Sequence, residues 1–143
     1  MDSLASILYA HSLGILFLVA IYFIALGGMS LFAPAKAKTF LLGFAGSAFR
    51  HYLEMALRLI VGGSILVQAP HLKYTGVFTL IGWLLIGTTA LLLLIPWTWH
   101  RRFAEKAVPI AVDYLPIIGI VSFALGVCLL FCLMQTLSFS HDG

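Results

Sequence analysis

Four apolar stretches, each long enough for a helix to cross a lipid bilayer, dominate this chain of 143 residues. They run from about residue 13 to 32, 52 to 69, 74 to 95 and 114 to 137. The hydrocarbon core of a bilayer requires a helix of about 20 apolar residues. The sequence therefore predicts an all-α fold, in the form of a polytopic membrane protein with four transmembrane helices.

The composition favours the same fold class. Hydrophobic residues make up 62% of the chain and charged residues 9%, whereas soluble domains average about 45–50% apolar and about 25% charged residues. A chain this short cannot bury so much apolar surface in one core, so we expect lipid to cover the remainder. The length leaves room for a single domain, residues 1–143. The segment Met1–Leu4 lacks the basic residues of a secretory signal, which predicts that the first span is retained.

Prolines mark the ends of the predicted spans. Pro34, Pro70 and Pro96 follow the first, second and third spans. Helices tend to end before a proline because its ring disfavours helical backbone at the preceding residue. Pro116 lies in the first turn of the fourth span, where its missing N–H costs little.

The two halves of the chain, residues 13–69 and 74–137, share a pattern. Each half reads as a span, a proline, a basic amphipathic segment and a second span. We interpret this pattern as a two-fold repeat whose axis would run along the membrane normal, with chance identity in apolar sequence as the alternative. Three pairs of identical residues are 62 positions apart: Pro34 and Pro96, Tyr52 and Tyr114, and Leu53 and Leu115.

Basic residues gather in two of the three connections between spans. Positive residues are retained on the cytoplasmic side of a membrane. We therefore expect both termini outside. The small size and general style of the sequence favour a bacterial protein, which would place it in the inner membrane. The first and third connections, with the start of the second span, carry Lys36, Lys38 and Arg50, and Arg101, Arg102 and Lys106, while the opposite side carries Lys73.

These two basic connections are predicted to be short amphipathic helices in the cytoplasmic membrane interface. Each opens with a proline and mixes cations with large apolar side chains, which is typical of interfacial helices. The alternative is that each helix packs on its own bundle. The predicted interface residues are Lys36, Lys38, Trp97, Trp99, Arg101, Arg102 and Lys106, with Phe40, Phe44 and Phe103 also directed toward acyl chains.

The charge pattern also predicts the partners of the chain. Cations beside membrane spans favour contact with anionic lipid headgroups on the cytoplasmic side. Nucleic acid is not expected, because the basic residues are few and adjoin the spans. Small residues let helices approach closely in lipid, so Gly62, Gly119, Ser122 and Gly126 are predicted helix-packing residues. We expect contact with other membrane subunits or with further copies of the chain.

The second span carries a polar cluster of Arg50, His51, Glu54 and Arg58. Positions 50, 54 and 58 follow an i, i+4, i+8 spacing, so they lie on one helix face. An unpaired charge at the bilayer centre costs at least about 2.5–3.5 kcal/mol, so we expect this face to point into the bundle or toward a partner subunit. It could serve an anionic group, a proton path or a subunit contact. Alternatively, Glu54 neutralises Arg58, which snorkels to the interface and fixes helix packing.

Four histidines could form one pair near each side of the membrane. His11 and His71 would lie near the outer side, and His51 and His100 near the inner side. Four-helix b-type cytochromes hold two haems with such pairs, so haem is a candidate cofactor. His71 and His100 fall in or beside connections, which favours histidines without ligands. No metal site is predicted, because His, Cys and carboxylates do not cluster and the two cysteines do not form a CxxC motif.

The stretch LGGMSLFAP from Leu26 to Pro34, followed by RHYLEMALRLIVGG from Arg50 to Gly63, resembles the small four-helix DoxX-like bacterial membrane proteins. Those proteins share a first span that ends in proline and a second span with an arginine before a glycine-rich run. The resemblance covers about the first half of the chain and implies the architecture alone.

The function predicted from these features is non-catalytic. The sequence contains no phosphate-binding loop, nucleophile elbow or HExxH motif. We therefore expect an accessory, assembly or stabilising subunit of a larger membrane complex. One alternative is a small oligomeric transporter or channel that uses Glu54 and Arg58. Another is a redox protein that handles haem or quinone through its histidines.

Overall fold

The computed structural model describes the fold of residues 2–44 and 47–141, and every element in these ranges is a helix. Four segments are long and apolar enough to cross a membrane: Ser3–Phe32, Ala48–His71, Thr75–Leu94 and Leu115–Ser138. The predictions of an all-α chain and of four such helices are confirmed. The elements are α1 (Asp2–Phe32), α2 (Pro34–Phe44), α3 (Ala48–Gln68), the 3-10 turn η1 (Ala69–His71), α4 (Thr75–Leu94), α5 (Trp97–Asp113) and α6 (Leu115–His141).

The helix ends follow from local chemistry. Ser47 caps α3, and its side-chain oxygen accepts a hydrogen bond from the Arg50 backbone N–H at 3.3 Å. Proline opens α2, lies within η1 and is the N-cap of α5. Pro109, however, lies inside α5, which continues to Asp113. The helix loses one backbone hydrogen bond there because proline has no N–H.

The first helix is longer than the predicted span. It begins at Asp2 rather than near residue 13, because residues 2–12 contain neither glycine nor proline to interrupt it. At about 1.5 Å per residue, its 31 residues extend about 46 Å. That length exceeds the hydrocarbon core of about 30 Å, so α1 would tilt or protrude in a bilayer.

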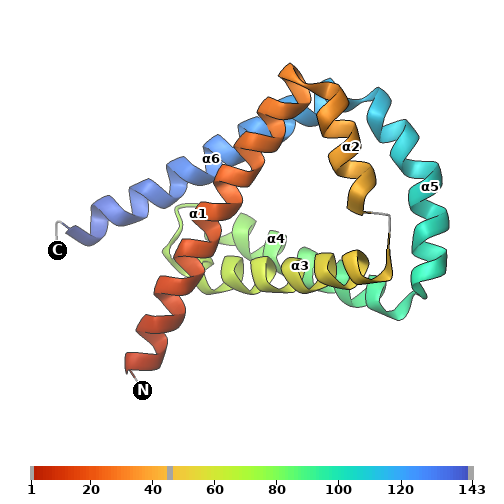
Figure 1. Cartoon of the computed structure of the whole chain (residues 1–143). Coiled ribbons are helices and arrows are strands. Elements are labelled where there is room, and N and C mark those ends of the chain that lie inside the picture. The colour runs from red at the N-terminus through yellow and green to blue at the C-terminus, as the bar shows by residue number, and fades with distance from the viewer. Residues whose placement is uncertain (1, 45–46, 142–143) are drawn as a thin grey trace.

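The long helices pack as two pairs, α1 with α6 and α3 with α4, and α1 also crosses α3. In Figure 1 both termini and the turn between α3 and α4 lie on the left, while α2 and α5 lie on the right. The two short helices contact each other there. Each half of the chain thus runs through a long, a short and a second long helix. The sequence repeat over 13–69 and 74–137 stays a prediction.

Close backbone contact at glycine joins both helix pairs. A Cβ atom built on Gly27 would lie 2.7 Å from the Gly119 carbonyl oxygen of α6, and one on Gly126 would lie 2.8 Å from the Ala20 carbonyl oxygen of α1. Between α3 and α4, Gly62 and Gly82 face each other. The predicted packing residues Gly62, Gly119, Ser122 and Gly126 are all buried.

The fold leaves an unusually large surface exposed. Its accessible surface is 9480 Å², whereas a soluble monomer of 15.6 kDa exposes about 7,200 Å². Large apolar side chains form much of this surface, and on α4 they include Trp83, Leu91 and Leu94. The outside of the bundle is therefore suited to contact with lipid or with other proteins.

Candidate functional site

The polar cluster predicted for the second span lies in the first half of α3. The Arg58 guanidinium and the Glu54 carboxylate form an ion pair across one helical turn, with 3.7 Å between Nη1 and Oε1. Each side chain keeps 34% of its surface exposed, and Arg50 is exposed as well. The charged face therefore lies on the surface of this chain. Of the two directions expected from the sequence, into the bundle or toward a partner subunit, the second stays a prediction.

Helix geometry explains why the charged face points outward. Residues four apart on an α-helix are rotated by about 40° relative to each other. The series 50, 54, 58 and 62 therefore turns by about 120° around α3, from exposed Arg50 to Gly62, which is buried against α4. Gly62 belongs to the helix contact, whereas the charged residues flank that contact. The sequence spacing identified neighbours on α3 but not the direction of the stripe.

His51 differs from the charged residues beside it. Its side chain is buried, and its ring contacts Tyr52 at 5.3 Å between centroids. On α1, Tyr22 contacts Phe40 of α2 at 6.5 Å between centroids, and it also interacts electrostatically with Glu54. Tyr22 thus joins α1 to α2 through a ring contact and is near enough to Glu54 of α3 to feel its charge.

The two short helices present basic and aromatic side chains outward. Ala37 of α2 is buried, so this helix rests partly on the bundle while its lysines face away from it. The exposed side chains include Lys36, Lys38, Trp99, Arg102, Phe103 and Lys106. The side chains of Phe44, Trp97, His100 and Arg101, which the sequence also singled out, lie outside the described residues.

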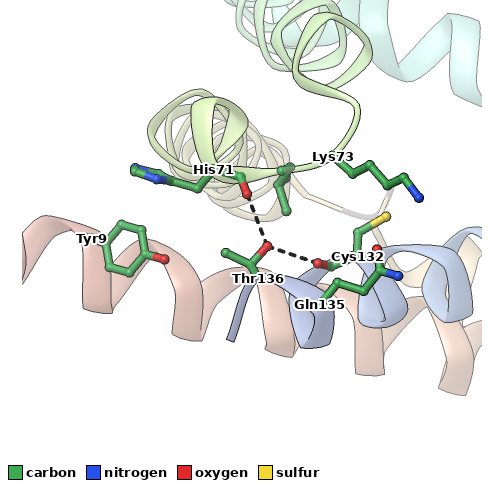
Figure 2. Close-up of a pocket in the computed structure, with 7 residues that line it drawn as sticks. Tyr9, His71, Lys73, Cys132, Gln135 and Thr136 are labelled. Atoms are coloured by element: carbon green, nitrogen blue, oxygen red, sulfur yellow. Dashed lines mark hydrogen bonds between the residues drawn. The ribbon is translucent and has the colours of Figure 1, made fainter. Parts of the chain in front are cut away.

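A cavity of about 600 Å³ lies at the opposite end of the bundle. It opens between the N-terminal half of α1, the turn after α3 and the C-terminal part of α6 (Figure 2). Its size falls in the range of small-molecule sites, about 300–1,000 Å³. Its lining residues are Tyr9, His71, Leu72, Lys73, Cys132, Gln135 and Thr136.

Hydrogen bonds between different helices fix the walls of this cavity. Gln68 is fully buried, and its amide donates to the Tyr9 carbonyl oxygen at 2.9 Å and to the Ser12 hydroxyl at 2.8 Å. The single proton of the Thr136 hydroxyl is shared between the His71 carbonyl oxygen at 3.3 Å and the Cys132 carbonyl oxygen of its own helix at 3.1 Å. The Tyr9 and His71 rings meet edge to face, with centroids 5.0 Å apart. These contacts tie α1, α3 and α6 together around the cavity.

The histidines do not form one site among the described residues. His71 lines the cavity, and the His11 ring contacts the Ile7 carbonyl oxygen through Nδ1 at 2.8 Å on α1. His51 lies at the other end of the bundle, in the first turn of α3. Within the described part of the chain, no group of three or more His, Cys, Asp or Glu residues could hold a metal ion.

The cavity was not identified from the sequence. Tyr9, Gln68, Cys132, Gln135 and Thr136 come from distant parts of the chain, and only the fold brings them together. Two signals were present nonetheless. Gln68 is an amide inside an apolar span, and Lys73 is the lone lysine or arginine on its side of the predicted topology.

Comparison of the chain with protein-family models, with curated proteins and with solved structures finds no match.

Proposed function

We propose that this chain is an integral protein of a bacterial inner membrane, with both termini outside and with α2 and α5 at the cytoplasmic interface. Four helices of sufficient length and apolarity support insertion. The termini and the α3–α4 turn share one end of the bundle, and the short basic helices share the other (Figure 1). The positive-inside rule then favours the cytoplasm for α2 and α5. Their exposed cations would contact anionic lipid headgroups.

Within that membrane, we propose that the protein is a non-catalytic accessory subunit that binds a larger membrane complex through the charged face of α3. The ion pair of Glu54 and Arg58 carries this proposal. Arg58 is ten positions from each terminal residue of α3, so it lies about 15 Å from either end. That position is close to the middle of a bilayer core about 30 Å thick.

Lipid is a poor cover for this pair. A charged side chain in the bilayer centre costs at least about 2.5–3.5 kcal/mol, and such residues face protein or water in most membrane proteins. The pair remains one-third exposed in this chain, although the two charges partly neutralise each other. A neighbouring subunit with polar groups at that depth would remove the exposed charge from lipid. The resemblance to DoxX-like proteins stays a prediction of architecture.

Site-specific photo-crosslinking in native membranes tests this proposal. A photoreactive residue replaces Leu57, which is exposed next to the ion pair, or Leu80, which is exposed on α4 as a matched control. We expect one discrete protein adduct from position 57 and no such adduct from position 80. Glu54→Gln should weaken the adduct from position 57, whereas Glu54→Asp, which keeps the charge, should retain it.

Two results would contradict the subunit proposal. The first is the absence of any protein adduct from the photoreactive residue at position 57, in membranes that contain the protein at its natural level. The second is the same set of adducts from positions 57 and 80, which would indicate random collision. An adduct whose mass equals two copies of this chain would instead assign the charged face to a homo-oligomer.

A further inference from the structure

The cavity between α1, the α3–α4 turn and α6 has the chemistry of a site for an anionic amphiphile. Most of its exposed lining is apolar, but one edge carries hydrogen-bond donors and a cation. In Figure 2 Lys73, Cys132 and Gln135 lie toward one edge, whereas the Tyr9 and His71 rings lie toward the other. Lys73 is also close enough to Cys132 for its charge to act on that side chain.

The charge of Lys73 is not neutralised by a described carboxylate. The one ion pair among the described side chains joins Glu54 and Arg58 on α3, and neither residue lines this cavity. The cavity lining includes no aspartate or glutamate. A ligand that supplies anionic oxygens would therefore find both an ammonium group and an amide N–H on the lining of one cavity, and hydrogen bonds to charged groups are the stronger ones.

A second, almost wholly apolar hollow lies next to the cavity on α6. It is lined by Phe123, Ala124, Val127, Cys128 and Phe131. Cys128 in this hollow and Cys132 in the cavity are one helical turn apart, so the two hollows adjoin on the surface of α6. The two hollows together follow α6 over about 20 Å, from Phe123 to Thr136. A head group at Lys73 could thus continue into a chain that lies along α6.

We propose that this composite groove binds an amphiphile with an anionic oxygen head group, a carboxylate or a phosphate, and a long acyl chain. The head group lies at Lys73 and Gln135, and the chain follows the α6 face at Val127. The hydrogen bonds of Gln68 and Thr136 hold the walls in place without the ligand. This inference rests on the proposed insertion in a membrane, where anionic amphiphiles with acyl chains are abundant.

Native mass spectrometry of the full-length protein in a neutral detergent tests the proposal. The protein is titrated with palmitate, with methyl palmitate as the uncharged match, and with inorganic phosphate as an anion without a chain. We expect palmitate to bind most tightly of the three ligands.

The Lys73→Gln variant should bind palmitate about fivefold more weakly, as expected for the loss of one cation at a membrane interface. Lys36→Gln, at the other end of the bundle, is the matched control and should bind palmitate as tightly as the natural chain does. Val127→Trp, at an exposed position of α6, should block the chain and weaken palmitate binding as well.

Competition distinguishes the two sources of the ligand. Displacement of palmitate by phosphatidate would identify a phospholipid, and failure of that displacement would identify a free fatty acid. Equal binding of methyl palmitate and palmitate, or equal binding to the Lys73→Gln and Lys36→Gln variants, would overturn the proposal. Binding of inorganic phosphate as tight as that of palmitate would overturn the role of the chain. If the protein enters detergent micelles but fails these binding tests, the proposed groove is wrong and the proposed membrane insertion is unaffected. If the protein stays monomeric in the absence of detergent, the proposed insertion itself is contradicted.

Discussion

The two helix pairs of this bundle are both joined at glycine, but they differ in what the glycine touches. Between α1 and α6, a Cβ on Gly27 would meet the Gly119 carbonyl oxygen and the Phe123 backbone nitrogen, both at 2.7 Å. Between α3 and α4, a Cβ on Gly62 would meet the Ile86 side chain at 2.8 Å. The nearest atoms include backbone in the first contact, whereas in the second the nearest atom belongs to a side chain and the backbone lies farther away.

This difference decides how much each contact can adjust. Backbone atoms of a helix cannot move without displacing the whole helix, whereas a side chain can change its rotamer at a cost of about 1 kcal/mol. Without a hydrophobic effect between helices in lipid, close packing and hydrogen bonds supply most of the association energy. We therefore expect the α1–α6 contact to tolerate added volume least. The free energies of unfolding of the variants below are compared in detergent, with circular dichroism as the measure of unfolding.

The largest effect is expected for Gly27→Ala. The added methyl group would force α1 and α6 apart, and overpacking of this kind lowers the free energy of unfolding by about 1–3 kcal/mol. The higher helix propensity of alanine offsets at most about 1 kcal/mol of this decrease. The neighbouring Gly28→Ala is the matched control, because nothing lies within 4 Å of its Cβ. This control should leave the free energy of unfolding unchanged or raise it. Equal behaviour of the two variants would show that α1 and α6 do not pack at Gly27.

A smaller decrease in the free energy of unfolding is expected for Gly62→Ala. Its Cβ would displace the Ile86 side chain, while the Gly82 carbonyl oxygen lies 3.3 Å away, so the helices need separate little. We expect a decrease of about 1 kcal/mol in the free energy of unfolding. Gly63→Ala is the control, since its Cβ would meet nothing within 4 Å. A loss larger than that of Gly27→Ala would reverse the order of the two helix pairs.

The sequence predicted the helices better than it predicted their orientation. Apolar length and proline position are local properties, so the four long helices could be recognised directly. Which member of each glycine pair packs could not be predicted, because adjacent residues differ by about 100° around the helix axis. Gly27 is in contact and Gly28 is not, and only the partner helix decides this.

The cavity and the charged face of α3 both depend on contacts between helices, which the sequence did not predict. Tyr9 and Thr136 line the same cavity although they are 127 positions apart in sequence, so no local pattern could pair them. The spacing of Arg50, Glu54 and Arg58 placed them correctly on one face of α3 but left the direction of that face open. The fold turned this face outward because Gly62, further along the same stripe, packs on α4.

Gln68→Leu probes a helix contact that is joined by a polar side chain instead of glycine. The variant loses the hydrogen bonds to Tyr9 and Ser12, but it also removes the Gln68 carbonyl oxygen, which is buried without a hydrogen-bond partner. Side-chain hydrogen bonds in membrane bundles average about 0.6 kcal/mol. We expect a decrease of about 0.6–1 kcal/mol in the free energy of unfolding, below that of Gly27→Ala. A larger decrease would show that the α1–α3 contact depends on this amide more than the α1–α6 contact depends on glycine.

The smallest effect on the isolated protein is expected for Glu54→Gln. The ion pair with Arg58 is one-third exposed and spans a single turn of α3, so it joins no two helices. Pairs of this kind contribute about 0.5 kcal/mol or less. The free energy of unfolding in detergent should therefore change by no more than that, and Glu54→Asp should match the natural chain within error. In native membranes the same Glu54→Gln variant should lose the adduct formed from position 57. A change that is small in the isolated protein but large in the membrane would assign the carboxylate to a partner, because internal packing would affect both measurements alike.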